Sequence, residues 1–170
     1  HNMAPIAELV HAGNALLLCD ATQAVGKIRV SVNEEGIDLL PLSAHKMYGP
    51  KGVGALYVRR KKPRVSLVPL MDGGGHENGL RSGTLNVTGI VGLGAACDLA
   101  LNEQWDDGIR ISKLRTKLEQ SLIDIGNIFV NGSQKQRLPN VSNLCFRGIK
   151  AERLITLLPE IAFSTGSACS

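Results

Sequence analysis

Aromatic side chains are scarce in this sequence, and their scarcity weighs against nucleic-acid binding. Phe, Trp and Tyr make up 4% of its 170 residues, and the formal net charge is only +4. The densest basic run, 58–64 (VRRKKPR), holds no aromatic ring on which a base could stack. We therefore interpret this run as a solvated turn rather than a nucleic-acid contact, and we expect no nucleic-acid partner.

Long apolar runs and paired cysteines are also missing. No stretch reaches the ~18 to 20 apolar residues that cross a bilayer, and the start of the chain shows no signal-peptide pattern. None of the four cysteines, Cys19, Cys97, Cys145 and Cys169, belongs to a Cys-x-x-Cys pair, which disfavours a zinc site or a thioredoxin-like redox pair. We expect free thiols in a reducing compartment, the cytoplasm, and no membrane contact.

What is present is an ordinary globular composition with many glycines. Hydrophobic residues make up 44% and charged residues 20% of the chain, as in proteins with a packed core. The 19 glycines predict tight turns and backbone held close to a ligand. The chain enters a helical pattern almost at its first residue and stops one residue after Cys169, so we expect a segment that is truncated at both ends.

Strand and helix patterns alternate along the chain. The predicted elements, in order, are helix 5–11, strands 15–19, 37–43 and 54–58, helix 86–125 with a break near 106–108, strands 128–130 and 141–146, helix 151–158 and strand 161–164. The continuous apolar run at 15–19 predicts a fully buried parallel strand. Pro41 weakens the assignment of its strand. This order predicts an α/β fold with a small α/β unit that starts near residue 127.

Polar side chains follow the first predicted strand. Asp20 ends the apolar run at 15–19, and Gln23 lies three residues further on. Because open α/β sheets bind ligands at the carboxyl ends of their strands, Asp20 could pair with a pyridinium nitrogen and make that ring a better electron sink. Asp is also a favoured helix N-cap, so both interpretations stay open.

A second polar cluster follows the strand at 37–43. Ser43, His45 and Lys46 lie within four residues and lead into a loop rich in Gly and Pro. The hydroxyl and the imidazole could hold a phosphate while the lysine amine forms a Schiff base with an aldehyde. A solvated lysine in a loop is the alternative. The glycines do not form a nucleotide-binding P-loop, because no G-x-x-x-x-G-K-[ST] string occurs.

Two later loops carry reactive groups. The first runs from three glycines at 73–75 through His76 and Glu77 to Thr84, and its polar groups suit a phosphate. His76 and Glu77 have no second histidine nearby in the sequence, so we expect no metal site. The second loop places Cys169 among small residues, where an accessible thiolate could attack sulfur or carbonyl centres. An inert thiol is the alternative.

Taken together, these strings resemble the cysteine desulfurases of the NifS-like and IscS-like branch, within the class-V aminotransferases. The matching strings, in the order of that family, are DATQAVG at 20–26, SAHKMYGPKG at 43–52, GGGHE at 73–77, RSGT at 81–84 and STGSAC at 164–169. The resemblance implies a pyridoxal-phosphate (PLP) enzyme of the aspartate aminotransferase type, fold type I. It implies that 1–126 is part of the large domain and that 127–170 begins the small one.

The resemblance also implies how the cofactor is held. Asp20 would pair with the pyridinium nitrogen, and Gln23 would donate to the phenolic oxygen of the ring. Ser43 and His45 would bind the phosphate. Lys46 would be both the catalytic lysine and the residue that carries the cofactor as a Schiff base.

Two residues have implied roles outside the cofactor ring. Thr84 would reach the phosphate of the other subunit's cofactor, which implies a homodimer. Cys169 would take sulfur from L-cysteine as a persulfide, release L-alanine and pass the sulfur to an iron–sulfur scaffold or another sulfur-acceptor protein.

The chain departs from the family pattern at its ends. The family's substrate-binding arginine and the upstream residues around the ring have no match here, so we expect little or no desulfurase activity from the chain alone. A selenocysteine lyase, an aminotransferase of the same fold and an inactive remnant remain the alternatives.

Overall fold

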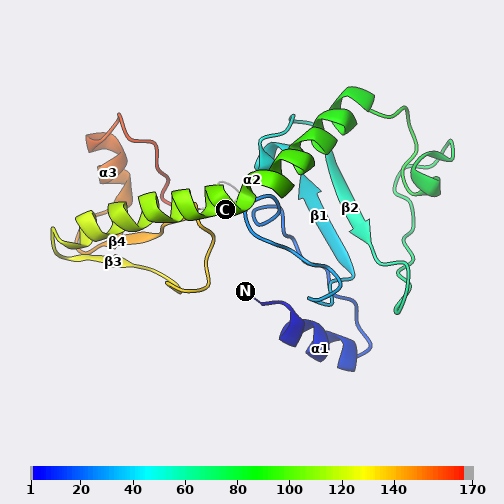
Figure 1. Cartoon of the computed structure of the whole chain (residues 1–170), viewed down its shortest axis with the longest axis horizontal. Coiled ribbons are helices and arrows are strands. Elements are labelled where there is room, and N and C mark those ends of the chain that lie inside the picture. Colours follow the sequence, from blue (N-terminus) through cyan, green and yellow to red (C-terminus); the bar gives the residue numbers. More distant parts are fainter. Residues whose placement is uncertain (1, 167–170) are drawn as a thin grey trace. The chain divides into compact units, whose positions relative to one another are not determined.

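The computed structural model of this chain describes residues 2–166 (Figure 1). The chain forms two compact units, His1–Gly108 and Ile109–Ser170. The long helix α2, Val87–Ile123, contributes residues to both. The predicted domain bounds, 1–126 and 127–170, stay a prediction. None of the helices in residues 2–166 combines the length and hydrophobicity of a membrane span.

The first unit opens with helix α1, Ala4–Ala12. Proline stands in its first turn, where its missing N–H and fixed φ suit a helix start. Ala7 is the buried residue of this helix, and Val10 packs against the same core. Gly13 accommodates the end of the helix. The predicted helix at 5–11 is therefore confirmed.

A two-stranded antiparallel sheet forms the centre of the first unit. Strand β1, Leu39–Ser43, pairs with β2, Gly54–Val58, in a register that places Leu39 opposite Val58 and Ser43 opposite Gly54. Both strands were predicted, and β2 has the predicted bounds. The N–H and C=O of Leu39 bond the segment at 15–19. By the two-residue alternation of a strand, the nitrogen of Pro41 faces the same side and leaves the β2 pairing intact.

The predicted fully buried strand at 15–19 is wrong. The segment makes one parallel bridge, Leu18 to Leu39, and belongs to no named strand. Leu17 is buried, but Leu16 and Leu18 are 48% and 58% exposed. Successive side chains of an extended segment point to opposite faces, and only the face of Leu17 meets the core of this unit.

Asp38 is a fully buried carboxylate that joins three parts of the first unit. Its Oδ2 accepts a hydrogen bond from Leu17 N at 2.8 Å and lies 2.7 Å from His11 Nε2. Its Oδ1 forms an ion pair with Arg59 Nε at 2.8 Å. Burial alone would raise the pKa of Asp38, but the Leu17 N–H, His11 and Arg59 outweigh it and hold that pKa below its usual value. Asp38 therefore fastens the 15–19 segment alongside β1.

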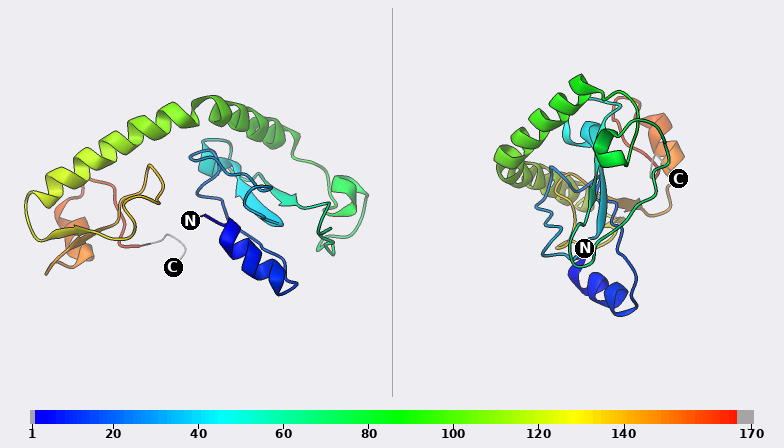
Figure 2. Two further views of the ribbon diagram at one scale, coloured as in Figure 1. Left: turned by 60° about the horizontal axis from the view of Figure 1, so that its bottom comes forward. Right: turned by 90° about the vertical axis from the view of Figure 1, so that its right-hand side faces the viewer.

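The N-terminal half of α2 lies against the segment that connects β1 and β2 (Figure 2). A Cβ added at Gly92 would lie 2.8 Å from Cγ of Pro50, and one at Gly49 would lie 3.1 Å from Cβ of Ala96. Small residues on α2 thus allow close contact with the loop after β1. The predicted break near 106–108 is wrong, because α2 is continuous there. A single interior glycine costs a helix only about 1 kcal/mol.

The second unit combines the rest of α2 with a small sheet and a short helix. Strand β3, Ile128–Val130, pairs antiparallel with β4, Leu144–Phe146, and α3 spans Ala151–Leu157. These elements were predicted, although β4 is shorter than 141–146. The predicted strand at 161–164 is wrong, since that stretch is irregular and pairs with no strand among residues 2–166.

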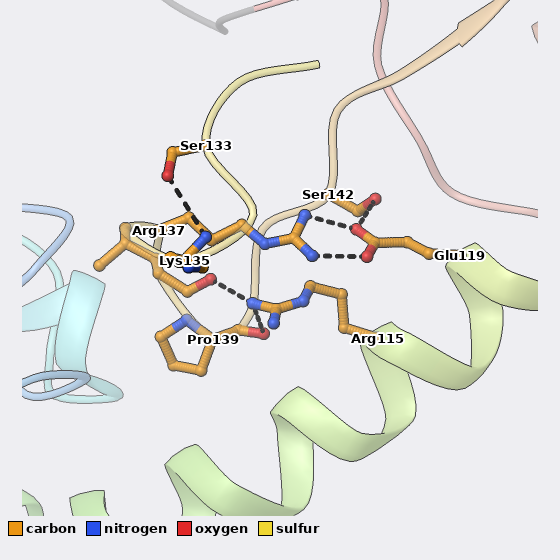
Figure 3. A network of polar contacts seen from close by, with 8 residues as sticks. Arg115, Glu119, Ser133, Lys135, Arg137, Pro139 and Ser142 are labelled. Atoms are coloured by element: carbon orange, nitrogen blue, oxygen red, sulfur yellow. Dashed lines mark hydrogen bonds and ion pairs between the residues drawn. The ribbon is translucent and has the colours of Figure 1, made fainter. Parts of the chain in front are cut away.

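A buried carboxylate on α2 anchors the connection between β3 and β4 (Figure 3). Glu119 is 5% exposed and accepts two hydrogen bonds from Arg137, at 2.8 and 2.6 Å, and one from Ser142 Oγ at 2.6 Å. Arg115, one helical turn earlier, donates to the carbonyl of Leu138 at 2.7 Å. Arg137 lowers the pKa of Glu119 more than burial raises it. The network fixes an otherwise irregular loop to the helix.

Candidate functional site

Two polar segments begin at the same end of two neighbouring stretches of chain. Leu18 bridges Leu39 in the parallel sense, with Cys19 N donating to Leu39 O at 2.9 Å. Asp20 follows the first stretch, and Ser43 ends the second, which is β1. Asp20 and Ser43 therefore follow two neighbouring stretches that run in the same direction, although the 15–19 segment belongs to no named strand.

Asp20 is exposed and receives two hydrogen bonds from one residue. Thr22 donates to Asp20 Oδ1 from its backbone N at 3.0 Å and from its hydroxyl at 2.5 Å. These two bonds, the hydroxyl first, lower the pKa of Asp20. Oδ1 thus fixes the turn that follows Asp20, and the helix N-cap interpretation is wrong because no helix begins there. Among the described residues, Asp20 Oδ2 has no hydrogen-bond donor, so the same carboxylate keeps an oxygen for a ligand.

Ser43, His45 and Lys46 are presented by a short helix that directly follows β1. The 3-10 helix η1 spans Ala44–Met47, and its two apolar end residues are buried while His45 is exposed and Lys46 half-buried. Ser43 Oγ lies 2.8 Å from His45 Nδ1. Anchoring by the apolar residues therefore turns a hydroxyl, an imidazole and an amine away from the core.

Lys27 joins the two polar segments. Its Nζ donates to the carbonyl of Lys46 at 2.8 Å and to the carbonyl of Gln23 at 3.4 Å. Burial and the nearby charge of Lys46 lower the pKa of Lys27. The turn that holds Asp20 and Gln23 thus lies against the helix that holds Lys46. Lys27 was not predicted as a site residue, because its only signal in the sequence is a cationic side chain soon after Gln23.

The loop that carries Thr84 is held to the triple-glycine loop. Ser82 Oγ donates to Gly74 O at 2.6 Å, and Ser82 N donates to Met71 O at 3.3 Å. Thr84 itself is exposed. Within residues 2–166, no hydrogen bond or ion pair links Thr84 to the two polar segments, so its role at a cofactor phosphate stays a prediction.

Cys169 lies outside the described residues, so its predicted role as nucleophile has no structural test. Cys19, Cys97 and Cys145 are free thiols. Burial, Glu35 and Asp20 raise the pKa of Cys19, which disfavours its thiolate. In the part of the chain from 2 to 166, no three His, Cys, Asp or Glu side chains gather in a way that could hold a metal ion.

The donor set of the two polar segments fits PLP. Asp20 offers a carboxylate oxygen to a protonated ring nitrogen, and Ser43 with His45 offers polar groups to a phosphate. Lys46 supplies an amine for the aldehyde. All four belong to segments that Lys27 holds in contact.

Comparison with known sequences points in one direction. Residues 1–170 match the family described as aminotransferase class-V. "Cysteine desulfurase IscS" of Anaeromyxobacter dehalogenans is 48% identical over 171 residues, and its namesake from Aeromonas hydrophila is 50% identical over 169. These matches take in 100% and 99% of the chain. The chain spans 42% of the length of each relative.

Solved structures agree with the sequence relatives. A structure named "NIFS-LIKE PROTEIN" is 37% identical, with a TM-score of 0.81 over 92% of this chain and 43% of its own. A NifS-like protein from Rickettsia africae is 30% identical, with a TM-score of 0.88 over 98% of this chain and 46% of its own. These likenesses confirm the predicted α/β fold.

Proposed function

The chain belongs to the aminotransferase class-V family, and from that premise we propose that it is the cofactor-lysine portion of a PLP-dependent cysteine desulfurase. The substrate is L-cysteine, and the products are L-alanine and a persulfide on Cys169. This proposal combines the residue chemistry of the two polar segments with the names of the relatives, "Cysteine desulfurase IscS".

One observation carries the proposal. Asp20 and the cluster that begins at Ser43 follow two neighbouring stretches that run in the same direction, joined by the Leu18–Leu39 bridge. Neighbouring strands lie about 5 Å apart, a spacing that one small aromatic ring can span. A carboxylate, a hydroxyl–imidazole pair and a lysine amine therefore follow stretches of chain whose spacing suits one small cofactor.

Each of these residues has one task at the cofactor. PLP, when bound, supplies an electron sink for charge that develops at the substrate Cα. Asp20, whose pKa Thr22 lowers, would pair as a carboxylate with the protonated ring nitrogen. Gln23 would donate to the phenolic oxygen, Ser43 and His45 would hold the phosphate, and the Lys46 amine would accept the Cα proton.

Cys169 completes the sulfur transfer in this proposal. Its thiolate attacks the sulfur of the bound substrate, forming an S–S bond as the substrate's Cβ–S bond breaks. The electron pair from that bond stays with the substrate carbon, which is protonated and leaves as L-alanine. The persulfide sulfur then passes to an acceptor protein, such as an iron–sulfur scaffold.

The wider setting of the protein belongs to the same proposal. Thr84 reaches the cofactor phosphate of a second subunit, so the active form is a homodimer. Free thiols without disulfide pairing favour the cytoplasm, where thiols stay reduced.

Adding PLP to the purified chain tests the cofactor role of Lys46. A Schiff-base absorbance band is expected in the wild-type chain and should vanish in Lys46→Ala. Lys51→Ala is the matched control, because Lys51 is an exposed lysine of the same loop. A band that survives Lys46→Ala, or that never forms in the wild type, would contradict the proposal.

Replacing Cys169 with serine separates a desulfurase from an aminotransferase of the same fold. With the chain placed in the full-length frame of one of its relatives, the variant is expected to lose persulfide formation from L-cysteine, measured by mass spectrometry of the protein, while keeping the absorbance band of Lys46. If sulfur release persists in Cys169→Ser, the desulfurase assignment is wrong.

A further inference from the structure

We propose that Lys27 is a positioning residue for Lys46: its ammonium ties the backbone of Lys46 to the turn that carries Asp20 and Gln23. The inference rests on the proposed function, which makes Lys46 the cofactor lysine. Lys27 contacts neither cofactor nor substrate in the proposed function. It holds the turn of Asp20 and Gln23, which bind the ring, at a fixed position relative to Lys46, which binds the aldehyde.

The tie consists of two hydrogen bonds from one ammonium group. The bond from Lys27 Nζ to the Gln23 carbonyl is long, 3.4 Å, and local, reaching four residues back. The bond to the Lys46 carbonyl is short, 2.8 Å, partly buried, and spans 19 positions of sequence. Charge-assisted hydrogen bonds are strongest at such short distances. The bond to the Lys46 carbonyl is therefore the stronger of the two, so Lys27 mainly joins the two segments and contributes less to its own turn.

The backbone beside Lys27 is shaped for this contact. Gly26 has a φ of +78°, and a Cβ there would lie 2.8 Å from Cβ of Met47, so only glycine fits without strain. Lys27 N donates to Ala24 O at 3.0 Å, which fixes Lys27 in the turn. The two segments are thus in contact at Gly26 and Met47, the residues next to Lys27 and Lys46. This contact keeps the Lys27 ammonium within hydrogen-bond distance of the Lys46 carbonyl.

The acceptor is well suited to a cation. The carbonyl of Lys46 belongs to the last turn of η1, where carbonyl groups have no partner further along the helix. A cation near such carbonyls is favourable. Lys27 therefore binds the main-chain carbonyl of Lys46. This hydrogen bond does not involve the side-chain amine of Lys46.

The test uses the 170-residue chain with pyridoxal phosphate as the probe. The Lys46 amine condenses with the probe's aldehyde and loses water; borohydride then adds hydride to the C=N bond, leaving a stable adduct that peptide mass spectrometry locates. Lys27→Met keeps an unbranched side chain, one atom shorter, but removes the donor, and should lower trapping at Lys46 about tenfold at subsaturating probe. Lys27→Arg restores N–H donors and should recover trapping to within about threefold. Lys113→Met, at an exposed lysine of α2, should change nothing.

Hydrogen exchange of the probe-free chain gives a second readout. Backbone amides at 47–49 should exchange faster in Lys27→Met and at the wild-type rate in Lys27→Arg. Trapping in Lys27→Met equal to wild type would overturn the inference, whatever the exchange rates, and would leave the proposed function intact. Failure of Lys27→Arg to recover either readout would also overturn it. If the wild-type chain traps nothing at Lys46, the proposed function fails, and the exchange rates alone decide whether Lys27 holds this backbone.

Discussion

Replacing Asp38 with alanine is expected to destabilise the first unit severely. The substitution removes the shared acceptor of three donors, Leu17 N at 2.8 Å, His11 Nε2 at 2.7 Å and Arg59 Nε at 2.8 Å. Arg59 has a side chain only 13% exposed, so its charge cannot simply return to water. Its bonds to the carbonyls of Val32 and Ile37 survive but do not neutralise it.

The magnitude follows from these contacts. Removing one partner of a buried ion pair costs about 3–5 kcal/mol, and an orphaned buried N–H adds about 1–3 kcal/mol. His11 adds little, because its side chain is one-third exposed. The costs overlap and Arg59 keeps two acceptors, so we expect a loss of about 4 kcal/mol. Whole domains are stable by only about 5–15 kcal/mol.

Urea unfolding followed by circular dichroism measures this loss. With a slope of about 2 kcal/mol per molar urea, the midpoint of Asp38→Ala should fall by about 2 M. Asp38→Asn keeps an oxygen for Leu17 N and should lose about half as much stability. Glu34→Ala, which removes an exposed ion pair with Arg29, is the control and should leave the midpoint unchanged.

A functional readout accompanies the stability change. The Leu17–Asp38 bond holds the segment that ends at Asp20 alongside β1. Asp38→Asn should therefore also weaken capture of pyridoxal phosphate at Lys46 under conditions where the chain is folded. A loss below about 1 kcal/mol in Asp38→Ala, the size of an exposed pair, would refute the reasoning that this carboxylate fastens the site.

Three further predictions follow from local geometry. Thr22→Val removes a hydroxyl donor and should raise the pKa of Asp20 toward its ordinary value, seen by NMR titration of the carboxylate. The pKa of Glu119 is lowered in the folded state, so stability should fall as pH drops below about 4.3, and Glu119→Gln should flatten that slope in urea titrations at several pH values. Gly26→Ala should cost at least about 1 kcal/mol in urea unfolding, because its φ is +78° and the new Cβ would meet Met47 at 2.8 Å; an unchanged midpoint would contradict the close approach.

Elements with strong local signals were predicted correctly. Helix α1 has a proline in its first turn and a glycine directly after its last residue, and β2 is an uninterrupted apolar strand, so neighbours in sequence suffice to define them. The stretches at 15–19 and 161–164 have equally apolar sequences. Whether these stretches form strands depends on a second strand that pairs with them and on side chains that bury them. Both come from parts of the chain that are distant in sequence.

The candidate site divides in the same way. Asp20, Ser43, His45 and Lys46 could be singled out because reactive side chains directly follow predicted strands. Asp38 and Lys27 were missed. Each acts on partners 19 to 27 residues away in the chain, and nothing in their immediate surroundings marks them, apart from a carboxylate between two apolar residues in the case of Asp38.

The amino-acid sequence by itself determined the chemical inventory of this protein: a lysine, a carboxylate and a hydroxyl–imidazole pair in strings that match one family along the whole chain. Such strings record which residue types are present and how they are spaced. That information suffices to recognise the reactive groups. Only the tertiary structure decided that Asp38 fastens the first polar segment to β1 and that Lys27 ties it to the helix of Lys46. Those contacts form because burying an unpaired charge is costly. Charged groups that are distant in sequence are therefore buried where they meet a partner.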